Sequence, residues 1–118
     1  LIRIPLSDSI AALEYGVNWV QLDAPRHFFL HTRKSIKIAT DMAGLQIVNV
    51  QYDSEEFQFI GSEVYSRSEM SLNDFYEDYG LNYSKIFKPE ESRAFRDRAD
   101  FLNKIEKGDQ AGFCLVKA

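Results

Sequence analysis

Several features are scarce in this chain of 118 residues. It contains one cysteine, three prolines and six glycines, and no apolar run approaches the roughly 20 residues of a membrane-spanning helix. The single Cys114 cannot form an internal disulfide, and one cysteine excludes a zinc site built from several thiolates of this chain. We therefore expect a buried, reduced thiol, a cytoplasmic location and no membrane partner.

Basic residues are also scarce relative to acidic ones. Lys and Arg number 14 against 18 Asp and Glu, which gives a formal net charge of −4. Proteins that bind nucleic acids usually present a basic patch or stripe, so this balance argues against a nucleic-acid partner. No basic segment followed by an apolar stretch is visible at the start, so the given residues show no signal peptide. The chain begins at Leu1, and we expect its true N-terminus to be missing.

The residues that are present suit one α/β domain. Hydrophobic residues make up 45% of the chain and aromatic residues 14%, enough for a core in a domain of this length. The apolar pattern predicts strands at residues 1–4, 45–52 and 113–117. It predicts helices at residues 10–15, 33–43, 71–79 and from Pro89 to about residue 105. Residues 53–65 have no clear period and are expected to be irregular.

Local signals fix several of these boundaries. Thr32 is a good N-cap for the helix that follows it, and Gly44 suits the position just after that helix. Because a helix joins the first two strands, we expect these strands to be parallel. Asp109 is expected in a solvated turn before the last strand.

One stretch, residues 18–32 with the sequence NWVQLDAPRHFFLHT, concentrates side chains suited to chemistry. His27 or His31 could act as a general base, because an unperturbed imidazole titrates near 6.5. Arg26 could hold an acidic substrate group through paired hydrogen bonds, next to Asp23. Trp19, the only tryptophan, could form a wall of a substrate pocket.

Each of these side chains also has a structural interpretation. Asp23 and Arg26 could pair and brace the loop. His27 could cap or pack beneath it, and Trp19 could anchor the core with its indole N–H hydrogen-bonded.

Metal binding is a further alternative for the two histidines. Their i, i+4 spacing would place two ligands on one face of a helix. Pro25 and the cap at Thr32 argue against a continuous helix there, and no third ligand beyond Asp23 is evident. We therefore expect no metal site.

Four segments, in order, resemble a known family: NWVQLDAPRHFFLHT, AGLQIVNVQYDS, FQFIGSEVY and NKIEKGDQAGFCLVK. They are similar to the C-terminal part of class I, Rossmann-like S-adenosylmethionine-dependent methyltransferases, and closest to a bacterial branch with a W-x-x-L-D-x-P-R-H segment. In that family the sheet order is 3-2-1-4-5-7-6, with strand seven antiparallel. The resemblance implies a partial Rossmann-like methyltransferase fold in which residues 1–4, 45–52 and 113–117 form a three-stranded mixed sheet of order 5-7-6, with covering helices.

The resemblance also implies which part of the enzyme this is. Residues 1–118 would be a single domain, the C-terminal segment of a larger methyltransferase domain, with a helical insertion at about residues 53–108. The family binds its cofactor with a Gly-rich turn after strand one. The glycines here are isolated, at positions 16, 44, 61, 80, 108 and 112. We therefore expect S-adenosylmethionine to be the cofactor of the full-length protein, with none bound by this segment.

Two functions follow as expectations. The first is the substrate-side segment of a cytoplasmic methyltransferase, inactive alone, whose partner is the missing N-terminal half of the same chain. Residues 18–32 would then lie at the carboxyl ends of the parallel strands, where ligands bind in open α/β sheets. The alternative is a non-enzymatic α/β interaction module that forms a homodimer through the open strand edge at residues 1–4.

Overall fold

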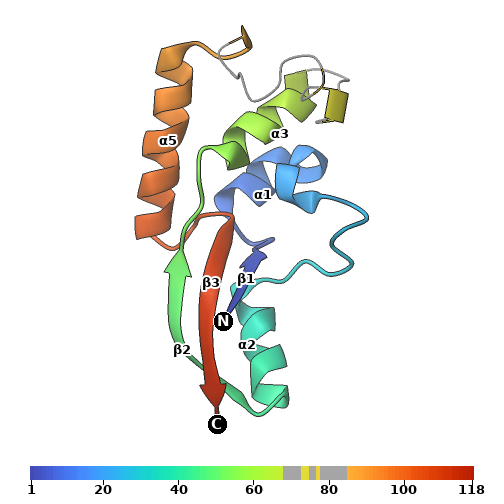
Figure 1. Cartoon of the computed structure of the whole chain (residues 1–118), viewed down its shortest axis with the longest axis vertical. Coiled ribbons are helices and arrows are strands. Elements are labelled where there is room, and N and C mark those ends of the chain that lie inside the picture. Colours follow the sequence, from blue (N-terminus) through green and yellow to red (C-terminus); the bar gives the residue numbers. More distant parts are fainter. Residues whose placement is uncertain (68–72, 75–76, 78–84) are drawn as a thin grey trace.

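The computed structural model describes residues 1–67, 73–74, 77 and 85–118. Its strands are β1 (Ile2–Pro5), β2 (Leu45–Tyr52) and β3 (Gln110–Lys117). Its helices are α1 (Ile10–Tyr15), α2 (Arg33–Met42), α3 (Phe57–Arg67) and α5 (Pro89–Lys104), with two 3-10 turns, η1 (Gly16–Asn18) and η2 (Val20–Leu22). The chain therefore has an α/β fold (Figure 1). Among the described residues, no helix is long and apolar enough to cross a bilayer.

The last strand lies in the middle of the sheet, whose order is β1-β3-β2. It runs antiparallel to both neighbours, with Ile4 opposite Ala111 on one side and Val50 opposite Phe113 on the other. β1 and β2 thus point in the same direction, as predicted, but β3 separates them. The prediction of a mixed sheet is therefore wrong: both pairs among the described strands are antiparallel.

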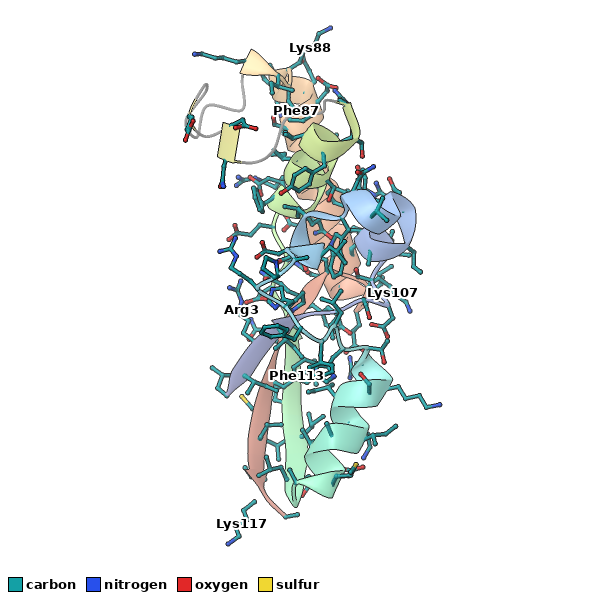
Figure 2. The ribbon with its side chains drawn as sticks, turned by 90° about the vertical axis from the view of Figure 1, so that its right-hand side faces the viewer. Arg3, Phe87, Lys88, Lys107, Phe113 and Lys117 are labelled. Carbon is teal, nitrogen blue, oxygen red and sulfur yellow. The ribbon has the colours of Figure 1, made fainter. Side chains whose placement is uncertain are left out.

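The helices gather mainly at one end of the sheet. In Figure 1, α1, α3 and α5 lie beyond the carboxyl ends of β1 and β2, whereas α2 lies alongside the sheet. Ile36 of α2 packs against Leu6 and Phe113 in a lower core, and Figure 2 places Phe113 between the strands and α2. An upper core among the helices contains Trp19 and Phe59. The loop with the candidate residues enters this upper core.

α2 and β2 follow their sequence signals closely. Thr32 Oγ1 accepts a hydrogen bond from Ser35 N–H at 3.0 Å, and Ser35 Oγ accepts one from Thr32 N–H at 2.9 Å, so the two residues form a capping box. After α2, Gly44 has a φ of +68°, a conformation that glycine adopts at no steric cost. The predicted N-cap and the predicted strand at 45–52 are both confirmed.

α3 differs from the prediction, because residues 53–65 were expected to be irregular. Its sequence lacks a clear period because most of the helix is buried, including Gln58, Phe59 and Ser62. Gly61, normally a helix breaker, is needed here: a Cβ at this position would lie 2.6 Å from Cγ2 of Val20. Close packing thus overrides the local propensity.

The C-terminal part of the chain shows three further outcomes. β3 begins at Gln110, three positions before the predicted start at residue 113. Cys114 on this strand is half-buried rather than buried. The predicted helix at residues 71–79 falls on a stretch that lies mostly outside the described residues.

The segment between β2 and β3 leaves and rejoins the sheet at one point. Asn103 Nδ2 donates to Ser54 O at 2.8 Å, and Ser54 N–H donates to Asn103 Oδ1 at 3.0 Å. Gln110 N–H, at the start of β3, donates to Ser54 Oγ at 3.0 Å. These bonds join the end of β2, the end of α5 and the start of β3.

Candidate functional site

The loop with the candidate residues runs from the end of α1 to the start of α2. Its first part is held by α3, because Val20 N–H donates to the buried Ser62 Oγ at 3.0 Å. Its last part runs beside the end of β1, where Ser7 N–H donates to His31 O at 2.9 Å. The loop therefore spans the carboxyl end of β1, next to the upper core.

Trp19 is an anchor of that core. Its side chain is 3% exposed, and its Nε1–H donates to Asp109 Oδ2 at 3.2 Å. Asp109 was expected in a solvated turn but is buried at the start of β3. This burial raises the pKa of Asp109 to about 6, although hydrogen bonds from Ser54 and Trp19 lower it. The prediction of a hydrogen-bonded core tryptophan is confirmed.

Asp23 and Arg26 form the brace that the structural interpretation predicted. Arg26 Nε lies 2.9 Å from Asp23 Oδ2, and Arg26 N–H donates to Asp23 O at 2.9 Å. Asp23 has a φ of +40°, in the left-handed region, so the chain turns sharply there. The Arg26 side chain is 80% exposed. Its guanidinium therefore remains accessible to a solute while it braces the turn.

The two histidines have different surroundings. His31 Nδ1 lies 3.2 Å from Ser35 Oγ, at the start of α2. His27 is half-buried and has no hydrogen-bond partner within the part of the chain that the structure describes. Residues 23–32 contain no helix, so the i, i+4 spacing does not place the two rings on one helix face. Among the described residues, no group of three potential ligands could hold a metal ion.

Part of the candidate set meets at one small pocket. Trp19, Asp23 and Tyr65 line a cavity of about 210 Å³ together with residues of η1 and η2. Arg26 reaches this group through Asp23, whereas the two histidines do not line the cavity. Tyr65 and Asp109 were not among the predicted site residues. Both are remote from the loop in sequence; Tyr65 belongs to an aromatic-rich stretch, whereas no local pattern marks Asp109.

Two phenylalanines of the loop are unusually exposed. Phe28 is 88% exposed and Phe29 is 81% exposed. They precede His31, whose backbone forms an isolated parallel bridge with Leu6, the residue just after β1. Adjacent exposed aromatic rings often mark a surface that contacts a partner or a ligand.

The described residues do not fit the cofactor of the family that the chain resembles. That family uses a Gly-rich turn directly after a strand. Here β1 is followed by Leu6 and Ser7, and β2 by Asp53 and Ser54, so no glycine stands at either turn. No protein-family model, curated protein or solved structure matches this chain, and these comparisons therefore assign it to no family.

Proposed function

We propose that this chain is the C-terminal, substrate-side segment of an S-adenosylmethionine-dependent methyltransferase and is inactive in isolation. The observation that supports this most is the strand order β1-β3-β2, with the last strand antiparallel to both neighbours. It corresponds to the order 5-7-6 of the class I fold, with strand seven in the centre. The position of residues 16–32 at the carboxyl end of β1 agrees with a substrate-side role.

Within this proposal, Arg26 and His27 are the residues that meet the methyl acceptor. Arg26 is exposed, so it can bind an acidic group of the acceptor while Asp23 holds its side chain in place. His27 is the better general base of the two histidines, because the ring of His31 already contacts Ser35. Trp19 and Asp23 form the wall of the adjacent cavity.

The cofactor is then bound by the preceding half of the same chain, which is the proposed partner. That half would pair with the outer edge of β1. Leu6 N–H donates to Asp109 O on β3, so by alternation Arg3 and Pro5 turn their backbone groups outward. The exposed Phe28 and Phe29 provide apolar surface on the same loop as the candidate site.

The alternative, a homodimeric interaction module that uses the β1 edge, requires the same surface. The structure offers no specific observation in its favour. It stays a prediction.

Calorimetric titration with S-adenosylhomocysteine tests the proposal. The 118-residue chain should show no binding, and a longer chain read from the upstream gene sequence should show saturable one-to-one binding. The upstream sequence should also encode a strand followed by a Gly-rich turn. Micromolar binding by the 118-residue chain, or an upstream sequence without such a turn, would overturn the proposal.

A further inference from the structure

The two open edges of the described sheet differ in the features that control pairing with another chain. β1 includes a charged Arg3 and a Pro5, and both residues discourage pairing with another chain. β2 has eight residues, LQIVNVQY, without a charge or a proline. β2 therefore lacks the charged side chains and prolines that protect many edge strands, and its protective feature is a bulge at Val48.

The pattern of half-buried and exposed residues along β2 is symmetric about the middle of the strand. From Leu45 to Val48 its residues alternate between half-buried and exposed, and from Asn49 to Tyr52 they repeat this pattern in reverse. A bulge causes the reversal: Ile47 lies opposite Leu115 and Asn49 opposite Cys114, which leaves Val48 without an opposite residue. The midpoint of this symmetry lies between Val48 and Asn49.

The backbone of the outer edge has the same symmetry. Ala118 N–H donates to Gly44 O, so alternate residues of β3, counted back from Ala118, turn their backbone groups toward β2. Their partners on β2 include Gln46 and Gln51. The half-buried residues of β2 therefore turn their backbone groups outward, and these are Leu45, Ile47, Val50 and Tyr52.

We infer that β2 pairs with β2 of a second copy of this chain, antiparallel, about a two-fold axis between Val48 and Asn49. Gln46 then lies opposite Gln51 of the second copy, and Ile47 opposite its Val50. A two-fold interface needs a surface that is complementary to itself, and this register pairs amide with amide at Gln46 and Gln51 and aliphatic with aliphatic at Ile47 and Val50. At the axis, Val48 lies opposite Asn49 of the second copy. The two three-stranded sheets join into one continuous sheet.

α2 and β2 enclose a groove of about 760 Å³, in which Lys34, Ile38 and Asp41 of α2 lie over Ile47 and Val50. The helix runs antiparallel to β2 (Figure 1). Asp41 is already paired within α2, because Lys37 Nζ lies 2.7 Å from Asp41 Oδ2.

Cross-linking tests the register directly. In a Cys114→Ser background, the double variant Gln46→Cys/Gln51→Cys places two thiols directly opposite each other across the interface. These are non-hydrogen-bonded positions, about 4.5 Å apart between Cα atoms, within the range for a disulfide. Mild oxidation should convert most of this variant into covalent dimer. Gln46→Cys alone is the control and should not cross-link, because its thiols would lie roughly 16 Å apart at about 3.3 Å per residue.

The mass of the chain in solution gives a second test. Light scattering should show a dimer at high concentration, and Val48→Lys should at least halve the dimer fraction, because two like charges then meet near the axis. Val116→Lys makes the same change at an exposed position of the central strand and should leave the dimer intact. Circular dichroism checks that both variants fold. A monomeric parent chain, equal cross-linking of the single and double cysteine variants, or an unchanged mass in Val48→Lys would overturn the inference, which does not depend on the methyltransferase proposal.

Discussion

The indole Nε1–H of Trp19 donates a hydrogen bond to Asp109 Oδ2 at 3.2 Å, and both side chains are buried. The contact joins the candidate loop to the start of the central strand. Because Trp19 is the only tryptophan of the chain, its fluorescence reports on this contact without interference.

Asp109 should make the stability of the chain depend on pH. Burial raises its pKa from 3.8 to about 6, so the folded chain binds this proton more tightly than the unfolded chain does. The free energy of unfolding should therefore be higher near pH 4 and fall as the pH rises through about 6, by roughly 3 kcal/mol at 1.36 kcal/mol per pKa unit. Urea denaturation followed by Trp19 fluorescence measures this slope.

The control for that experiment is Asp109→Asn. Its amide oxygen can still accept from Trp19, but the side chain does not titrate. The variant should lose the fall in stability between about pH 4 and 6. An identical slope in the variant would assign the pH dependence to other groups.

Trp19→Phe should separate the hydrogen bond from apolar packing. The phenyl ring keeps contact with Phe59 and Ala11 but cannot donate to Asp109. We expect a loss of about 1–3 kcal/mol at neutral pH, because a buried carboxylate loses a donor. The pKa of Asp109 should also rise further, since the bond from Trp19 lowers it. Carboxyl-carbon NMR titration measures the pKa, and a lower value in the variant would contradict this account.

Gly61→Ala should destabilise the chain although alanine favours helices. The added Cβ would lie 2.6 Å from Cγ2 of Val20, and overpacking of a core costs about 1–3 kcal/mol. The double variant with Val20→Ala removes the clashing methyl groups and should lose less stability than the sum of the two single changes. Simple additivity in denaturant unfolding would show that the two residues do not interact.

Arg26→Ala tests the functional role of the exposed brace. Because the Arg26 side chain is 80% exposed, the change should alter stability by no more than about 1 kcal/mol. If the proposed methyltransferase assignment holds, the same change in the longer chain should raise KM for an acidic acceptor at least several-fold. An unchanged KM would leave Arg26 with a structural role alone.

His27→Asn and His31→Asn test which histidine is the general base of the proposed methyltransferase. The first change should lower kcat, with little effect on folding, because it removes the general base. The second should mainly affect the start of α2, where His31 contacts Ser35. The reverse result would assign the base to His31.

The sequence predicted the elements whose signals are local. Thr32 and Gly44 mark the ends of α2 by cap chemistry, and the apolar residues of 45–52 mark β2. α3 could not be predicted in this way, because Gly61 and its buried polar residues look unfavourable until Val20 packs against them.

The candidate site was predictable in part for the same reason. The pairing of Asp23 with Arg26 depends on neighbours three positions apart, and it was expected. The burial of Asp109 depends on Trp19, far away in the sequence, and on the path of the whole helical segment. Nothing near Asp109 in the chain distinguishes it from an ordinary surface turn.

The hydrogen bonds between Ser54 and Asn103 have a consequence for how such a chain can change. These bonds hold the two ends of the segment between β2 and β3 together next to the sheet. Side-chain changes within α3 and α5 that leave Ser54 and Asn103 intact should therefore leave the register between β2 and β3 unchanged.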